Sequence, residues 1–92
     1  MVKQKNNPST SKQDSAALQR GLILHNDDVN TFDFVIDTLV EVCNHEHEQA
    51  EQCALITHFK GKCTVKTGDY HEMKPMCDEM TIRGLTVSID IL

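Results

Sequence analysis

The pattern of apolar and polar residues from residue 20 onward begins with a strand, a turn and a helix. Residues 21–25 form a short apolar run of strand length, and the short polar side chains of Asn26, Asp27 and Asp28 end it in a turn. Apolar residues then recur with the spacing of one helix face, at Phe32, Val35, Ile36, Leu39 and Cys43.

Capping residues predict where the first two helices begin and end. Asn30 is a good N-cap for the first helix, and Asp33 three positions later gives a near-match to a capping box. A second helix should run from about His47 to Lys60, where Gly61 stops it.

The rest of the chain adds two strands and a third helix. Residues 62–67 alternate polar and apolar side chains, as a half-buried strand does. A helix is expected over Tyr70–Met80, or from nearer Lys74, because Pro75 would remove a backbone hydrogen bond inside it. Residues 85–91 alternate without a miss, so their Leu, Val and Ile side chains should face a core.

The order of these elements predicts one α+β domain over residues 20–92. Its β-α-α-β-α-β order favours two layers, a three-stranded antiparallel sheet with three helices on one face. Residues 1–19 are rich in Asn, Ser, Lys and Gln and cannot bury enough apolar surface to offset the entropy of ordering. We therefore expect them to form a flexible N-terminal extension.

Composition changes this picture in two respects. The 92 residues contain no apolar run long enough to span a membrane and no apolar core of a signal peptide, so a cytoplasmic protein without membrane association is expected. In such a compartment cysteines remain thiols. This expectation covers Cys43, Cys53, Cys63 and Cys77.

Charge is unevenly distributed along the chain. The net charge is −5, yet the first 20 residues carry four basic side chains and one acidic one, so the predicted domain is strongly acidic. An acidic domain repels the phosphates of nucleic acids and favours cationic ligands. Nucleic acid is therefore not expected as a partner.

Two common enzyme classes find little support in the residues. A phosphate-binding loop needs clustered glycines before a helix, whereas Gly21, Gly61, Gly68 and Gly84 are scattered. No cysteine lies in a motif that resembles a known nucleophile site. We expect a protein that is not an enzyme and needs no cofactor.

A metal site is the main alternative from the residues alone. Cys43, His45 and His47 lie close together, and Cys53 and His58 follow, but their spacings differ from the pairs typical of structural zinc sites. We interpret the first three as part of a polar turn between helices that exposes both histidines. A small metal-binding module and a generic interaction domain, such as the C-terminal domain of the ribosomal stalk protein, remain alternatives.

The acidic corner also has a purely structural interpretation, because Asn and Asp often form Asx turns. However, the segment LILHNDDVNTFDFVIDTL, followed by CALITHFKGKC, resembles the ClpS adaptor proteins over about residues 20–74, and the resemblance extends to the last strand. The resemblance implies a monomeric adaptor that binds proteins with a large hydrophobic N-terminal residue. It would deliver them to a Clp-type AAA+ unfoldase (ClpA- or ClpC-type) and its peptidase.

The resemblance also implies roles for individual residues. Asn26, Asp27 and His58 match the positions that contact the α-amino group of the substrate. An ammonium has three donors and no acceptor, and a carboxylate, an amide oxygen and a neutral imidazole nitrogen supply the acceptors that it needs. The implied side-chain pocket and its rim comprise Phe32, Val35, Ala54, Thr57 and Leu85 with Asp28 and Asn30.

The sequence departs from the family pattern in the pocket. Phe32 stands where Met is common at the gate, and Ala54 and Thr57 replace the usual Met and Val, so a wider and more polar pocket is expected on the second-helix side. Asp69 and Lys74 match positions of the surface that docks on the unfoldase, although the third helix looks shorter than usual.

Overall fold

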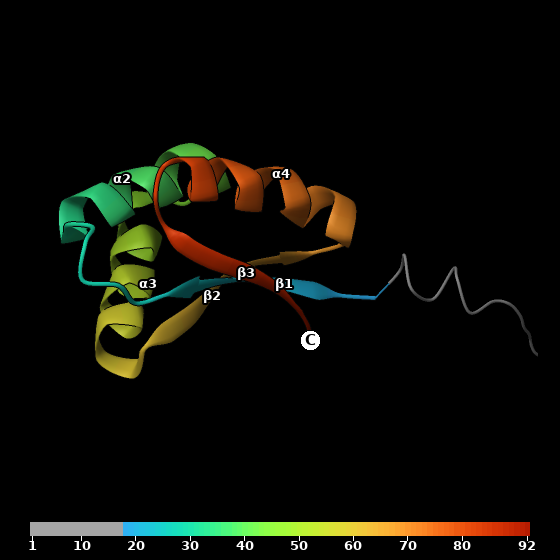
Figure 1. Ribbon diagram of the computed structural model, residues 1–92, viewed down its shortest axis with the longest axis horizontal. Helices are drawn as coiled ribbons and strands as arrows, with labels where there is room; N and C mark the ends of the chain where they lie inside the picture. Colours follow the sequence, from blue (N-terminus) through green and yellow to red (C-terminus); the bar gives the residue numbers. More distant parts are fainter. Residues whose placement is uncertain (1–17) are drawn as a thin grey trace, which may run out of the picture.

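The computed structural model describes residues 18–92, which form one sheet covered by helices (Figure 1). The elements follow in the order β1 (Arg20–His25), α2 (Phe32–Cys43), α3 (His47–Lys60), β2 (Lys62–Gly68), α4 (Tyr70–Ile82) and β3 (Thr86–Ile91). The strands pair antiparallel in the order β2-β1-β3. The predicted element order and α+β class are confirmed, whereas most of the expected flexible extension lies outside the described residues.

The central strand β1 holds the layers together. Its residues Gly21 to Leu24 are all buried, because β2 and β3 flank the strand and helices cover one face. Leu22 and Leu24 point into a core that also contains Leu39 of α2 and Met80 of α4. Burial of these side chains removes apolar surface from water and orders β1 at the centre of the domain.

The first helix begins one residue later than the cap we expected. Thr31, not Asn30, is the N-cap of α2, and its hydroxyl accepts a hydrogen bond from the backbone N–H of Phe34 (3.1 Å). Both residue types cap helices well. The side chain of Asn30 instead bonds to Asp27 and to the distant Gly84 carbonyl, which no local pattern reveals.

The third helix extends beyond the prediction at its C-terminal end. Helix α4 runs through Pro75 to Ile82, and its start is fixed by a capping box between Asp69 and Glu72. Pro75 has no N–H to donate to the carbonyl of His71 one turn earlier, and both residues are exposed.

The edges of the sheet differ from the expected pattern of burial. The last strand begins at Thr86 and is only partly buried, with Ile91 64% exposed, so its alternation does not place every apolar side chain in the core. The carbonyl of Gln19, a residue that we had placed in the extension, accepts a hydrogen bond from the N–H of Leu92 (3.1 Å).

His45 is buried, which corrects the prediction of an exposed histidine pair in the turn after α2. Its Nε2 lies 2.6 Å from the Val65 carbonyl oxygen and must donate to it, so the imidazole is the Nε2–H tautomer. Val65 lies at a register shift in the pairing of β1 with β2. His47 is exposed, as expected.

Three further features concern the end of α2, the cysteines and the length of the helices. Lys66 donates a hydrogen bond to the Cys43 carbonyl at the C-terminal end of α2 (2.9 Å), where a positive charge suits the helix dipole. Cys43, Cys53, Cys63 and Cys77 are not joined in disulfides. Within the part of the chain that the structure describes, no helix has the length and apolar character needed to cross a membrane.

Burial makes His45 a source of acid sensitivity. Burial lowers the pKa of His45, the charge of Lys66 lowers it further, and the hydrogen bond to Val65 opposes both. A histidine in the unfolded chain binds a proton near the ordinary pKa of 6.5, so the unfolded state binds more protons just below that pH. The contribution of His45 to the free energy of unfolding is therefore present above pH 6.5 and decreases as the pH falls below that value.

We predict that lowering the pH from about 7.5 to about 5.5 reduces the free energy of unfolding by up to about 1.4 kcal/mol through this histidine. Urea denaturation at both pH values measures the loss. A His45→Gln variant retains an amide donor for Val65 but does not titrate, so it should lose less. Equal losses in the two proteins would contradict the prediction.

Candidate functional site

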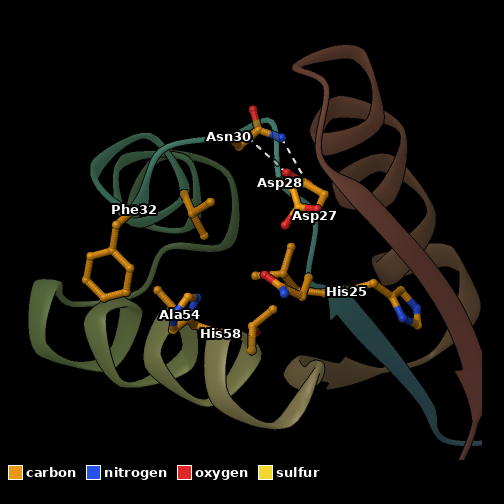
Figure 2. Close-up of a pocket in the computed structure, with 11 residues that line it drawn as sticks. His25, Asp27, Asp28, Asn30, Phe32, Ala54 and His58 are labelled. Atoms are coloured by element: carbon orange, nitrogen blue, oxygen red, sulfur yellow. Dashed lines mark hydrogen bonds between the residues drawn. The ribbon is translucent and has the colours of Figure 1, made fainter.

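The corner between β1 and α2 is built around the carboxylate of Asp27. Its Oδ1 accepts hydrogen bonds from the backbone N–H groups of Val29 and Asn30, both at 2.9 Å. Its Oδ2 accepts a third from Nδ2 of Asn30 at 3.0 Å, drawn as a dashed line in Figure 2. Burial would raise the pKa of Asp27, but the bonds from Asn30 and Val29 outweigh burial and lower the pKa.

Hydrogen bonds tie this corner to two other segments. The N–H of Asn26 donates to the carbonyl of Gly61 (2.9 Å), the residue that ends α3. Nδ2 of Asn30 also donates to the carbonyl of Gly84, between α4 and β3 (2.9 Å). The corner therefore has a fixed position relative to the end of α3 and to the loop before β3.

A cavity of about 440 Å³ opens between the corner, the start of α2 and the buried face of α3 (Figure 2). Its volume lies in the range of small-molecule sites. The residues that line it are Leu24, His25, Asn26, Asp27, Asp28, Asn30, Phe32, Val35, Ala54, Thr57 and His58.

The structure brings together all but one of the residues predicted for ligand binding. The exception is Leu85, which is 4% exposed and belongs to the hydrophobic core but does not line the cavity. Leu24 and His25 line the cavity although sequence reasoning missed them. Their position immediately before the polar corner was the available signal. The His25 ring points away from the cavity, and its Nε2 lies 2.8 Å from the Ser88 hydroxyl (Figure 2).

Polar acceptors surround one part of the cavity. Asn26 and His58 are exposed, whereas Asp27 is half-buried. A carboxylate offers about four lone-pair sites, of which the corner itself occupies three. One position on Asp27 therefore remains for a donor from a ligand. Asp27 also has a structural role, because its carboxylate holds the corner together.

The apolar part of the cavity lies between α2 and α3. Figure 2 shows the ring of Phe32 on α2 close to Ala54 on α3, and Phe32 is 40% exposed. Thr57 is buried, and its hydroxyl donates a hydrogen bond to the Cys53 carbonyl within α3 (2.8 Å). That hydroxyl is satisfied inside the helix, so a ligand need not pair with it. The α3 side of the cavity is therefore less polar than the presence of Thr57 in the sequence led us to expect.

The two residues proposed for docking have local partners at the start of α4. Asp69 accepts a hydrogen bond from the N–H of Glu72 (2.8 Å) as the helix cap, and Lys74 forms an exposed ion pair with Asp78 (2.8 Å). In Figure 1 this end of α4 lies at the opposite end of the domain from the corner. Docking and ligand binding would therefore use separate surfaces.

The cysteines and histidines do not form a metal centre. Among residues 18–92, no three His, Cys, Asp or Glu side chains lie together in a way that could hold a metal ion. His45 bonds to Val65, and the Cys43 thiol donates to the sulfur of Met80 (3.7 Å). The metal-binding alternative thus gains no support from the geometry.

Comparisons with a family model and with individual proteins give matches to one family. Residues 19–88 match the family model described as ATP-dependent Clp protease adaptor protein ClpS. The chain is 38% identical over 55 residues to the ATP-dependent Clp protease adapter protein ClpS of Nitratidesulfovibrio vulgaris and 40% identical over 55 residues to that of Serratia proteamaculans. These matches cover 58% of this chain and 55% and 52% of the two relatives, so the chain spans about half their length.

A solved structure of ClpS2 from Agrobacterium tumefaciens bound to L-phenylalaninamide is similar in fold. The TM-score is 0.79 at 18% identity, and the match covers 83% of this chain and 99% of that chain. At this identity, the likeness concerns the fold alone.

The role of Asn30 in holding the corner gives a test of this geometry. Asn30→Ala removes the donor to Asp27 and Gly84, so we expect the free energy of unfolding to decrease by about 1–3 kcal/mol. Asn30→Asp should decrease the free energy of unfolding further, because it places a carboxylate opposite the Asp27 carboxylate and the Gly84 carbonyl. Urea denaturation of the two variants and the wild type measures this order. An Asn30→Asp protein as stable as the wild type would show that these bonds do not hold the corner.

Proposed function

Because the chain belongs to the ClpS family of ATP-dependent Clp protease adaptor proteins, we propose that it binds the N-terminus of proteins whose first residue is large and hydrophobic. It then delivers them to a Clp-type AAA+ unfoldase and its peptidase. The observation that carries the proposal is the cavity itself, in which an acceptor-rich corner lies next to an apolar space. The protein acts as a monomeric adaptor and performs no reaction itself.

The α-amino group of the substrate binds at the corner. Its three N–H donors meet the free lone-pair position of Asp27, the amide oxygen of Asn26 and a ring nitrogen of His58. Hydrogen bonds to charged groups contribute about 1.5–3 kcal/mol each. An acetylated N-terminus has no charge and fewer donors, so the corner would discriminate against it. The lowered pKa of Asp27 supports this role, since it keeps the carboxylate anionic.

The first side chain of the substrate enters the apolar part of the cavity. Phe32, Val35 and Ala54 are among the residues that line the cavity, and Asp28 and Asn30 are proposed to form its rim. The ligand of the ClpS2 structure, L-phenylalaninamide, joins an α-amino group to an aromatic ring and so has the chemistry that this cavity would take. The small side chain of Ala54 leaves room for such a ring.

Delivery uses the other end of the domain and the N-terminal residues. The start of α4, with Asp69 and Lys74, is proposed to dock on the unfoldase. Residues 1–19 contain few apolar side chains and could span roughly 60–70 Å if extended, enough to reach into a neighbouring translocation channel. They therefore act in delivery and not in recognition of the substrate.

Recognition of the α-amino group can be tested with a pair of peptides. A peptide that begins with Phe should bind, and its acetylated form should bind at least about tenfold more weakly, because one charge-assisted bond corresponds to about 1.5 kcal/mol or more. His58→Ala should weaken binding of the free peptide to a similar extent. Isothermal titration calorimetry measures both effects.

His71→Ala is the matched control for this experiment. His58 and His71 are both exposed on helices. Each imidazole ring lies edge-on to the aromatic ring of a neighbouring residue, which is Phe59 for His58 and Tyr70 for His71. Of these two histidines, His58 lines the cavity and His71 does not. Equal affinities for the free and acetylated peptides, or equal effects of the two substitutions, would remove the corner as the α-amino site.

The role of the N-terminal residues is tested by deleting residues 1–15. No cavity residue is lost, so peptide affinity should stay within about twofold, which corresponds to about 0.4 kcal/mol. Degradation of a substrate with an N-terminal Phe by a Clp unfoldase and peptidase should nevertheless slow markedly. Degradation at the full rate would assign these residues no part in delivery.

A further inference from the structure

Three consecutive residues of α3 point to the core, the cavity and the solvent. Successive residues of an α-helix are about 100° apart around its axis, so neighbouring side chains leave the helix in different directions. Thr57 is buried, His58 lines the cavity and Phe59 is 77% exposed. The large apolar ring of Phe59 therefore lies in solvent beside the imidazole that is proposed to bind the α-amino group.

The rings of His58 and Phe59 form a close aromatic pair. Their centroids are 5.0 Å apart and their planes are at 75°, which is the edge-to-face arrangement that aromatic rings prefer. Side chains at adjacent helix positions do not face each other by default, so the two rings must lean toward one another to make this contact. In a second pair of this kind, Tyr70 and His71 of α4, the centroids are further apart, at 6.3 Å.

The contact with Phe59 is the main restraint on the His58 ring. The Asp27 carboxylate accepts three hydrogen bonds within the corner, whereas the His58 ring makes no hydrogen bond or ion pair with any of the residues 18–92. An exposed side chain without such bonds changes rotamer rapidly, and a ligand that uses it must offset the entropy of ordering it. An aromatic ring packed against the imidazole reduces that freedom.

We propose that Phe59 is a positioning residue for His58: it holds the imidazole toward the cavity, where a ring nitrogen accepts a hydrogen bond from the α-amino group of the substrate. The inference rests on the proposed binding of that group at the corner. Phe59 does not line the cavity and contributes little to the core, so it acts through His58 and not through contact with the first residue of the substrate.

The first test compares side chains at residue 59 by isothermal titration calorimetry with a peptide that begins with Phe. Phe59→Leu keeps an apolar side chain but removes the ring, so the peptide should bind about three- to tenfold more weakly, as expected for the loss of one aromatic pair. Phe59→Tyr keeps the ring and should bind as the wild type does. Ile56→Ala, at another exposed apolar residue of α3, is the control and should also retain the wild-type affinity.

A double-mutant cycle separates positioning from direct contact with the peptide. In a His58→Ala background there is no imidazole to orient, so the addition of Phe59→Leu should change the affinity by less than about twofold. A loss of the same size in both backgrounds would overturn the proposal. The Tm of Phe59→Leu should lie within about 3 °C of the wild-type value, because residue 59 is at the surface.

NMR spectroscopy gives a readout that does not depend on a variant. In the wild type we expect nuclear Overhauser contacts between the ring protons of His58 and Phe59. In Phe59→Leu, loss of the ring current should shift the Hδ2 and Hε1 resonances of His58. Absence of the Overhauser contacts in the wild type would overturn the proposal even if the affinities changed.

The same measurements distinguish failure of this inference from failure of the proposed function. If the wild type prefers the free peptide to its acetylated form and Phe59→Leu binds the free peptide equally tightly, the positioning role is overturned and the α-amino site stands. If the wild type does not discriminate between the two peptides, the α-amino site and the positioning role are overturned together.

Discussion

The hydrogen bonds accepted by Asp27 are the interaction on which the site depends. They turn the chain from the end of β1 into α2, and they hold Asn30 so that its amide also reaches the loop after α4. The same bonds lower the pKa of Asp27, so its charge is retained and one acceptor position stays available to a ligand. In the proposed function, structure and recognition thus use one carboxylate, and hydrogen bonds within the chain already set the geometry of the corner.

The rest of the fold gives this corner a rigid base. The buried strand β1 fixes where the corner begins, and the bond from Asn26 to Gly61 fixes its distance from the end of α3. Arg83, at the end of α4, forms an ion pair with Glu79 of the same helix and another with Glu41 of α2. The second ion pair connects α4 to α2. The start of α4 lies far from the corner between β1 and α2 in Figure 1, so the surfaces that we propose for docking and for peptide binding are separate.

The sequence was sufficient for the order of elements and for the polar corner, because both depend on local information, whereas the part of the cavity formed by α3 was expected only from the resemblance to the ClpS adaptors. Periodicity predicted the strands and helices, and the polar residues of the corner were adjacent in the chain. The errors came from long-range partners. Asn30 was taken for the cap because its bond to Gly84 is not visible in the sequence, and His45 was expected to be exposed because its partner, Val65, belongs to another element. Leu85 was assigned to the cavity, but only packing shows that it fills the core.

The small residues of α3 explain why the cavity and the helix packing are linked. The buried residues of α3 are Ala50, Cys53, Ala54 and Thr57, so this helix can lie close to its neighbours but buries little apolar surface of its own. Its position then depends strongly on its C-terminal end, where Gly61 adopts a left-handed φ of 94° and accepts the bond from Asn26. Larger residues at these positions would add contacts to the core but would fill the space beside Phe32. The same small side chains therefore let α3 approach the sheet and leave the apolar part of the cavity open.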